Sequence, residues 1–278
     1  MAGATISRLP DGRLHLHHGP IDIIAQAWGD PATVAQAEQR ACARFGSVLA
    51  ELVSELPALR RNDGTVSGQI AQRMAGATLP FRPAFITPMA AVAGAVADTL
   101  LAEFALPGIL RAYVNNGGDI ALHLAPSESL TCAIAARAGL PDRITIRSAD
   151  KVRGIATSGW RGRSWSFGIA DSVTVLAPSA AMADAAATMI ANAVTLPDHP
   201  GIQRRAACEM QADSDLGTRE VTVGVTGLTE NDIARALTAG ESAAHQFRAR
   251  GLIEAAALFL HPDMRIIGPM PLKEPACV

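Results

Sequence analysis

Apolar residues follow two different spacings along the chain, and together these predict an α+β fold. Alternation with a period of two covers residues 13–29, with turn residues at Pro10-Asp11-Gly12 and Gly19-Pro20, which predicts an opening antiparallel hairpin. Asp30-Pro31 then has the chemistry of a helix start, with the acid as N-cap and proline in the first turn. Apolar positions recur at helical spacing from there to about Leu59.

The rest of the chain alternates between short strands and alanine-rich helices. Strands are expected as a pair over 112–124, and at 131–136, 143–148, 152–157, 172–177, 220–225 and 255–268. Helices are expected at 88–104, 180–194 and 229–250, with a loop and a short helix within 60–80 and a frayed tail after Pro269. Consecutive short strands joined by turns favour antiparallel sheets over a doubly wound parallel sheet. We therefore expect antiparallel sheets packed against long alanine-rich helices whose small-residue faces are buried.

Composition narrows the protein class. With 278 residues and 49% hydrophobic content, the chain can form a single domain over 1–278, built as one body or as two intimate lobes. The formal charge of -2 gives no global field for nucleic acid or an anionic membrane, so neither is an expected partner. Acidic residues interrupt the two longest apolar segments, 89–106 and 179–194, which therefore read as buried helices and not membrane spans. The N-terminus carries no export signal, which predicts a cytoplasmic protein with reduced cysteines.

One pair of polar residues stands out within an alanine-rich helix. Asp184 and Thr188 are four positions apart and share one helical face. A carboxylate among buried alanines needs a partner, because an unpaired buried charge is too costly to keep. A divalent cation, the terminus of another helix or a structural hydrogen bond would each serve.

Two further segments have both a structural and a functional interpretation. Thr87 can cap the helix that follows, whose small residues form a smooth face for close packing against a sheet or against a ligand and its phosphates. This face consists of Ala90, Ala91, Ala93, Gly94 and Ala97. The double glycine in the turn 115–118 is typical of a plain hairpin and also permits a phosphate to approach the backbone. Asp119, next to the turn, raises interest in the second interpretation.

Other candidate chemistry is weaker. His15 and His17 share one face of a strand, but without a third ligand a solvated polar face is favoured over a metal site. The acidic turn 213–217 reads as solvated. The sequence has no Walker lysine motif, no G-x-G-x-x-G at a helix start, no H-E-x-x-H and no G-x-S-x-G elbow. The common nucleotide-binding and protease classes lose support accordingly.

Three segments in this order resemble the ApbE-like flavin transferases, which bind FAD and, with magnesium, transfer its FMN part to a Thr or Ser of a target protein. The small-residue helix with Gly94 and Asp98 is similar to the first segment of that family, and the turn with Asn116, Gly117, Gly118 and Asp119 is similar to its glycine pair after a strand. Its remaining signature resembles Thr157-Ser158-Gly159, Ser172-Val173-Thr174-Val175 and Ala183-Asp184-Ala185-Ala186-Ala187-Thr188. The matched core is 86–194.

The chain departs from that family at two places. Ala93 stands where the family usually has Lys, and the segment 160–171 is shortened and lacks the family His and its Pro-x-Thr-Gly. With these two losses, the sequence resembles a shorter, uncharacterised bacterial and archaeal branch of the superfamily. The resemblance implies an ApbE-like fold and pocket more strongly than it implies the transfer reaction.

The resemblance also implies a set of site residues. Flavin or nucleotide contacts are expected from Thr87, Asp98, Asn116, Gly117, Gly118, Asp119, Thr157, Ser158 and Gly159, and Mg²⁺ contacts from Asp184 and Thr188. No catalytic residue is identified, with Asp119 or His199 the nearest candidates for a replacement base. The expected function is a Mg²⁺-dependent protein that binds FAD or a related nucleotide, either as a divergent FMN or nucleotidyl transferase or as a non-catalytic accessory protein. The resemblance also suggests, as a third possibility, a role in sulfur and homocysteine metabolism. Formation of a homo-oligomer is left open.

Overall fold

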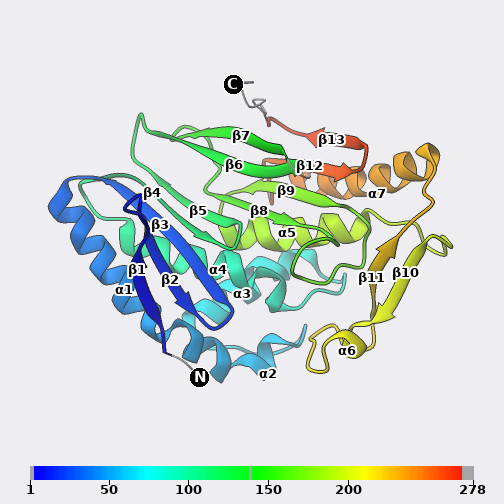
Figure 1. The fold of residues 1–278 in the computed structure, drawn as a ribbon, viewed down its shortest axis with the longest axis horizontal. Coiled ribbons are helices and arrows are strands. Elements are labelled where there is room, and N and C mark those ends of the chain that lie inside the picture. Colours follow the sequence, from blue (N-terminus) through cyan, green and yellow to red (C-terminus); the bar gives the residue numbers. More distant parts are fainter. Residues whose placement is uncertain (1–2, 138–139, 271–278) are drawn as a thin grey trace. The chain divides into compact units, whose positions relative to one another are not determined.

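A computed structural model describes residues 3–137 and 140–270 of the chain (Figure 1). Its residues form two compact units. The first contains those of Met1–Leu130, Thr145–Ala156 and Ala177–Asp184, and the second contains those of Thr131–Ile144, Thr157–Leu176 and Ala185–Val278. The expected arrangement as one domain stays a prediction, and each unit is described by itself. The predicted tail after Pro269 falls mostly outside the described residues.

An antiparallel sheet forms the centre of the first unit. Its strands are β1 (Thr5–Arg8), β2 (Leu14–His18), β3 (Ile21–Gly29), β4 (Ile109–Asn116) and β5 (Asp119–Leu124), paired in that order. The first residues of β8 (Gly154–Ser158) extend it beyond β5, because Gly154 and Ile155 pair with Ala121 and Ile120. The predicted opening hairpin and the predicted strand pair at 112–124 are therefore confirmed.

Helices cover one face of this sheet. They are α1 (Pro31–Ser54), α2 (Leu56–Leu59), α3 (Gln69–Thr78) and α4 (Val92–Leu101), with short 3₁₀ turns η1 (Leu79–Phe81), η2 (Pro88–Ala91) and η3 (Ala102–Phe104). Helix α1 packs on β2 and β3, α4 packs on β4 and β5, and the two helices touch each other, so both lie on the same face (Figure 1). Phe45, Leu100 and Leu122 are fully buried in the core between these layers.

The second unit has its own antiparallel strands. Strand β12 (Ala255–Leu260) pairs with β9 (Ser172–Ala177) on one side and with β13 (Asp263–Ile267) on the other, and α7 (Glu230–Ala249) packs along β12 and β13. A separate pair joins β10 (Ile202–Ala206) to β11 (Glu220–Val225), with the short helix α6 (Ala207–Met210) between them. At the start of α7, Thr229 and Asp232 form a complete capping box.

Five of the described elements run from one unit into the other along the chain, among them β8 and β9. Strands β6 (Ser129–Arg137) and β7 (Leu140–Arg147) pair with each other, and α5 (Ala180–Ala193) has its first residues in the first unit. The expected burial of the alanine-rich face is confirmed on α5, where Ala183, Ala186 and Ala187 have no exposed surface. The face predicted around α4 is buried only in part, because Ala91, Gly94 and Ala97 are buried whereas Ala90 and Ala93 are half-buried. The fold is α+β, with antiparallel sheets against alanine-rich helices, as the pattern predicted.

Three predicted elements are divided in the structure. The helix expected from Pro31 to about Leu59 is α1 followed by the short helix α2, with Glu55 between them. The helix expected at 88–104 is a 3₁₀ turn, then α4, then a second 3₁₀ turn. Thr87 stands at the N-cap position of the first turn, but its side chain makes no capping hydrogen bond, so the predicted Thr87 cap is wrong. The segment 255–268 is two strands that reverse at His261-Pro262, because proline cannot supply a ladder hydrogen bond.

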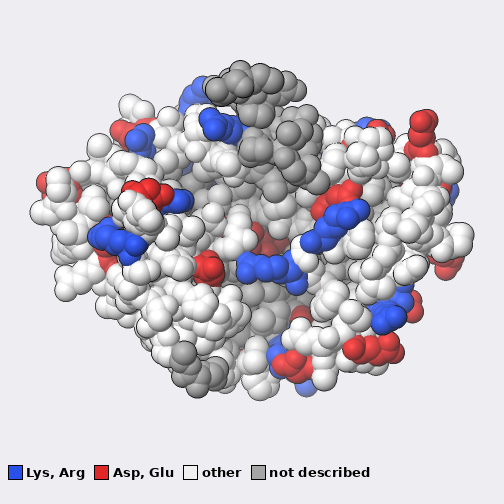
Figure 2. Space-filling model, in the orientation of Figure 1, with Lys and Arg blue, Asp and Glu red and all other residues white. Residues whose placement is uncertain are grey.

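Positive and negative side chains are interspersed on the face of the molecule drawn in Figure 2. This mixing agrees with the near-neutral formal charge of -2. No helix in the described part of the chain combines the length and the apolar character needed to cross a membrane.

Candidate functional site

The glycine turn between β4 and β5 is a two-residue hairpin connection. Gly117 and Gly118 have φ of 64° and 115°, a region that residues with a Cβ rarely adopt. The Gly118 N–H donates to Asn115 Oδ1 at 2.8 Å, which fixes the turn. A Cβ added to Gly118 would meet nothing within 4 Å, so its glycine serves the backbone conformation and the space beside it is open.

The starts of α4 and α5 are capped by each other's carboxylates. Asp98 of α4 accepts hydrogen bonds from the N–H groups of Ala180 and Ala181, at 3.0 and 2.9 Å. In return, Asp184 of α5 accepts the Gly94 N–H at 3.1 Å. The 3₁₀ turn before α4 makes this exchange available, because the α-helix restarts at Val92 and leaves the Gly94 N–H without an intrahelical partner. Each carboxylate also lies at the positive end of a helix dipole.

Two glycines, one in α4 and one in β8, let these elements approach the backbone at the start of α5 closely. A Cβ on Gly94 would lie 2.7 Å from the Ala181 nitrogen, and one on Gly154 of β8 would collide with the backbone of Ser179. The neighbour that packs on the small-residue face of α4 is therefore the first turn of α5. Of the two interpretations left open for that face, close packing is the one found at Gly94.

Asp184 also meets a second acidic residue. Burial raises the pKa of Asp184 well above its ordinary value, and the charge of Asp119, whose side chain hydrogen-bonds that of Asp184, raises it further. Of the three partners considered for Asp184, a helix terminus is present, supplied by α4. Two carboxyl groups this close cannot both ionise freely, so they hold a proton between them or take up a cation.

Asn116 connects the glycine turn to the same cluster. Its Nδ2 donates to the carbonyl of Ala93 at 3.1 Å, and the residue is buried. The turn, the start of α4 and the carboxyl groups of Asp119 and Asp184 are thereby brought together inside the first unit, although the sequence separates them widely. We call Asn116, Asp119, Asp184 and the α4 start at Gly94 the carboxyl cluster.

Asp98 has a structural role in addition to the ligand contact that the resemblance implied. Both of its oxygens accept hydrogen bonds from the first turn of α5, so Asp98 acts as a structural cap of that helix. Burial raises the pKa of Asp98, while the two backbone N–H groups and the charge of Arg73 act in the opposite direction. Contact of Asp98 with a ligand stays a prediction.

The predicted residues at the end of β8 belong to the second unit. Thr157 Oγ1 lies 2.8 Å from Thr174 Oγ1 of β9, so the two hydroxyl groups share a hydrogen bond. A Cβ on Gly159 would lie 2.5 Å from the carbonyl oxygen of Asp171, which explains this glycine by packing. Ser158 is half-buried next to them, and Thr188 stands one turn after Asp184 on α5. A ligand contact by any of these four residues stays a prediction.

The segment that lacks the family His is held by structural contacts. Asn192 Oδ1 accepts hydrogen bonds from Ser166 Oγ at 3.1 Å and from the Phe167 N–H at 2.9 Å. Arg204 Nη1 donates to the Phe167 carbonyl at 2.6 Å. The segment is therefore an anchored loop of the second unit.

The histidines considered for metal or base chemistry have other partners. His199 accepts the Gly201 N–H at its Nδ1, at 3.1 Å, and its Nε2 lies 3.5 Å from Asp232 Oδ2 in the α7 capping box. His15 Nε2 lies 2.7 Å from Asp22 Oδ1 on the neighbouring strand. In the described ranges, no group of three or more His, Cys, Asp or Glu residues is placed to hold a metal ion.

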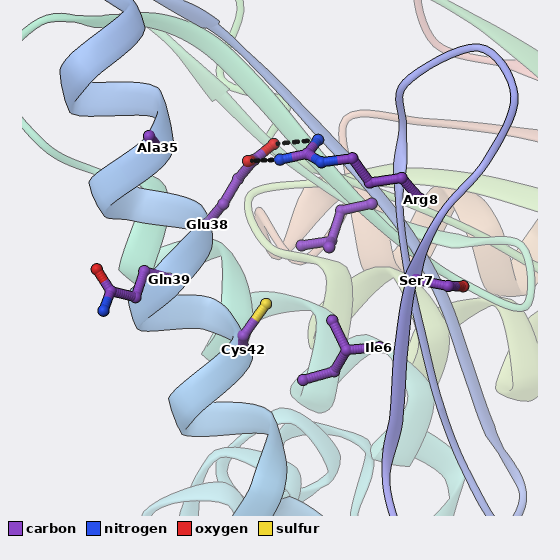
Figure 3. Close-up of a pocket in the computed structure, with 8 residues that line it drawn as sticks. Ile6, Ser7, Arg8, Ala35, Glu38, Gln39 and Cys42 are labelled. Carbon is purple, nitrogen blue, oxygen red and sulfur yellow. Dashed lines mark hydrogen bonds and ion pairs between the residues drawn. The ribbon is translucent and has the colours of Figure 1, made fainter.

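A separate hollow of about 430 Å³ lies between β1 and α1 (Figure 3). Arg8 and Glu38 face each other across it as an ion pair, and Ile6 and Cys42 line it further along. Burial raises the pKa of the Cys42 thiol, which makes it a poor nucleophile near neutral pH. None of the predicted site residues lines this hollow, so it is distinct from the carboxyl cluster.

Comparison with known proteins identifies the family. The family model described as "AbpE bacteria" matches residues 6–266. The chain belongs to this family. This agrees with the resemblance drawn from the three sequence segments and extends it over nearly the whole chain.

Curated relatives cover part of the chain. A UPF0280 protein of Methanopyrus kandleri is 36% identical over 160 residues, which are 57% of this chain and 63% of that protein. A UPF0280 protein of Methanothermobacter thermautotrophicus is 40% identical over 120 residues, or 42% of this chain and 46% of that protein. The matches thus span from about half to less than two thirds of these relatives.

A solved structure supports the fold. The crystal structure of the ApbE protein of Thermotoga maritima aligns with a TM-score of 0.51 and 13% identity, covering 95% of this chain and 97% of that one. At this identity the likeness concerns the fold alone, which is α+β in both.

The mutual capping of α4 and α5 was missed from sequence, although part of its signal is present. Ser179 precedes α5 and accepts the Met182 N–H at its Oγ, at 3.2 Å, as an N-cap serine does. That pattern predicts the helix start. It carries no information about Asp98, because the acceptor comes from a helix about 80 residues earlier.

Proposed function

We propose that this protein binds a flavin or adenine nucleotide, such as FAD, together with Mg²⁺ at the carboxyl cluster. The observation that carries the proposal is the contact of Asp119 and Asp184 beside the open glycine turn. Family membership supports it, since the ApbE-like flavin transferases that the sequence resembles bind FAD with magnesium.

The chemistry of the cluster fits magnesium. Mg²⁺ prefers hard oxygen ligands and keeps several waters, so a site needs only one or two carboxylates when a phosphate is also present. Asp184 and Thr188 would hold the ion, with Asp119 as a neighbouring carboxylate. The raised pKa of Asp184 supports this assignment, because two adjacent carboxyl groups lack a positive charge that a cation would provide. When bound, the ion would neutralise pyrophosphate charge and act as a Lewis acid.

The protein's own residues would position the ligand. Gly117 and Gly118 form a turn that allows a pyrophosphate to approach the backbone closely, and Asn116 ties that turn to the start of α4. The further proposed ligand contacts are Thr87, Asp98 and Thr157-Ser158-Gly159.

The cytoplasmic location, homo-oligomer formation and absence of nucleic-acid binding stay predictions.

We further propose that flavin transfer is inefficient, so that the accessory-protein alternative is favoured over a full transferase. Two observations support this. The segment 160–171 contains no histidine and is anchored by Asn192. His199 accepts the Gly201 N–H at Nδ1, and its Nε2 faces Asp232 of the α7 capping box. Without a base, nothing obvious deprotonates a hydroxyl whose pKa lies far above neutrality, and loss of such a group costs roughly 10²- to 10⁴-fold in rate. Asp119 is the remaining candidate.

The binding proposal predicts metal-dependent affinity that Asp184 controls. Titration of FAD, FMN, ADP and ATP, with Mg²⁺ and with EDTA, should show tighter binding with the ion. Asp184→Asn should reduce the Mg²⁺-dependent part by about 10- to 100-fold, which corresponds to about 1.4 to 2.8 kcal/mol. Asp22→Asn, at an exposed carboxylate of β3, is the matched control and should change nothing. Equal binding with and without Mg²⁺ would remove the cation from the proposal.

The transfer proposal predicts no covalent flavin. Incubation with FAD, Mg²⁺ and a peptide bearing the family's acceptor motif should leave the peptide mass unchanged, while a flavin transferase included as a positive control modifies it. Multiple turnover by this protein would show that another group has replaced the missing histidine. In that case, loss of turnover in Asp119→Asn with retained FAD affinity would identify Asp119 as the base.

A further inference from the structure

Arg73 in α3 is a half-buried arginine with unused hydrogen-bonding capacity. Its Nε is shielded from solvent and has no hydrogen-bond partner within the described residues. A guanidinium carries five N–H donors in a fixed plane, and leaving a buried donor unsatisfied costs free energy unless a ligand or water supplies the acceptor. A buried N–H donor without an acceptor is the arrangement expected of an arginine that binds an anionic ligand.

Arg73 lies near one of the proposed ligand contacts, Asp98. Helix α3 packs against η2 and α4 within the first unit, so Arg73 belongs to the layer that carries Thr87 and Asp98. Its charge acts on Asp98 and opposes the effect of burial on the pKa of that carboxyl. The two groups therefore interact electrostatically.

Asp98 does not use up the donors of Arg73. Both oxygens of Asp98 already accept N–H groups from the first turn of α5, and no hydrogen bond joins Asp98 to the guanidinium. The partial positive charge of that helix start offsets the negative charge of Asp98 as well. The guanidinium thus keeps its charge and at least its Nε–H donor for a further anion.

We infer that Arg73 binds a phosphate group of the nucleotide. Arginine is suited to this because its planar fork matches two phosphate oxygens at once. The inference rests on the proposed function and deepens it. It adds α3 to the site and names the phosphates as the part of the ligand that Arg73 recognises. The alternative is that Arg73 only balances the charge of Asp98 inside the fold.

Affinity measurements on Arg73→Gln and Arg73→Lys separate these roles. Arg73→Gln should weaken ADP and FAD by about 10- to 100-fold, as expected for loss of charge-assisted hydrogen bonds, and should leave riboflavin, which has no phosphate, unchanged. Arg73→Lys should recover part of the loss, because it restores the charge without the fork. Arg61→Gln, which removes an exposed arginine paired with Asp63, controls for net charge and should have no effect.

Thermal unfolding of the ligand-free variants completes the test. An unchanged midpoint in Arg73→Gln, together with the phosphate-selective loss, supports the inference. A lowered midpoint with unchanged ADP and FAD affinity assigns Arg73 to the charge balance of Asp98 and overturns it. An equal loss for riboflavin and FAD also overturns it.

Failure of the proposed function is distinguishable from failure of this inference. If the wild-type protein binds none of the nucleotides, the proposed function fails, and inorganic pyrophosphate becomes the probe for Arg73. A rise in the wild-type melting temperature with pyrophosphate that Arg73→Gln abolishes would still support an anion site. The same rise in both proteins, or none in either, would overturn it.

Discussion

Replacing Gly94 with alanine is expected to lower the free energy of unfolding by about 3 kcal/mol, the upper part of the range for overpacked sites. The new Cβ would lie 2.7 Å from the Ala181 nitrogen, and the obstacle is backbone, which cannot rotate away as a side chain can. Relief requires α4 and α5 to separate. Separation would also stretch the hydrogen bond from the Gly94 N–H to Asp184. The midpoint of urea unfolding measures the effect.

A second helical glycine provides the matched control. Gly46 lies inside α1, is exposed, and has nothing within 4 Å of the position that a Cβ would take. Gly46→Ala should therefore stabilise the protein by about 0.8 to 1 kcal/mol, because alanine is the better helix former. The same chemical change should thus have opposite signs in two helices of one unit. Similar small effects at both positions would show that the α4–α5 crossing is loose.

Local patterns predicted most elements because each has its own signal. Strands β9 and β11 coincide with the predicted 172–177 and 220–225, where apolar residues are bounded by turn residues. The start of α1 follows from Asp30, whose side chain accepts the Thr33 N–H. Strand β10 and helix α6 lie in a stretch without strong periodicity, and the pattern therefore did not predict them.

The carboxyl cluster could be predicted only in part. Sequence spacing marked Asp184 as a buried acid that needs a partner, and the glycine turn drew attention to Asp119. Neither signal says that the two side chains meet, because that contact depends on how α5 crosses α4. Arg73 gave no signal at all, since an arginine in an amphipathic helix is normally solvated and only its buried Nε distinguishes it.

Asp98→Ala is expected to destabilise the protein by about 2 to 3 kcal/mol, because it leaves two N–H groups at the start of α5 without their acceptor. The small-residue packing around Ser179–Ala181 leaves little room for water to replace the carboxylate. Asp98→Asn should lie between alanine and the wild type, since one amide oxygen can accept only part of what two carboxylate oxygens accept.

Asp30→Ala is the matched control, because Asp30 caps α1 at an exposed position and its loss should cost about 1 kcal/mol. Equal losses at Asp98 and Asp30 would mean that solvent reaches the start of α5 and that the carboxylate is an ordinary surface cap. Nucleotide titration of Asp98→Asn then separates structure from binding. If Asp98 acts through α5 alone, its affinity for FAD should stay at the wild-type value once the experiment is run well below the melting temperature. A selective loss of FAD affinity at unchanged stability would instead place Asp98 against the ligand, as the family resemblance implied.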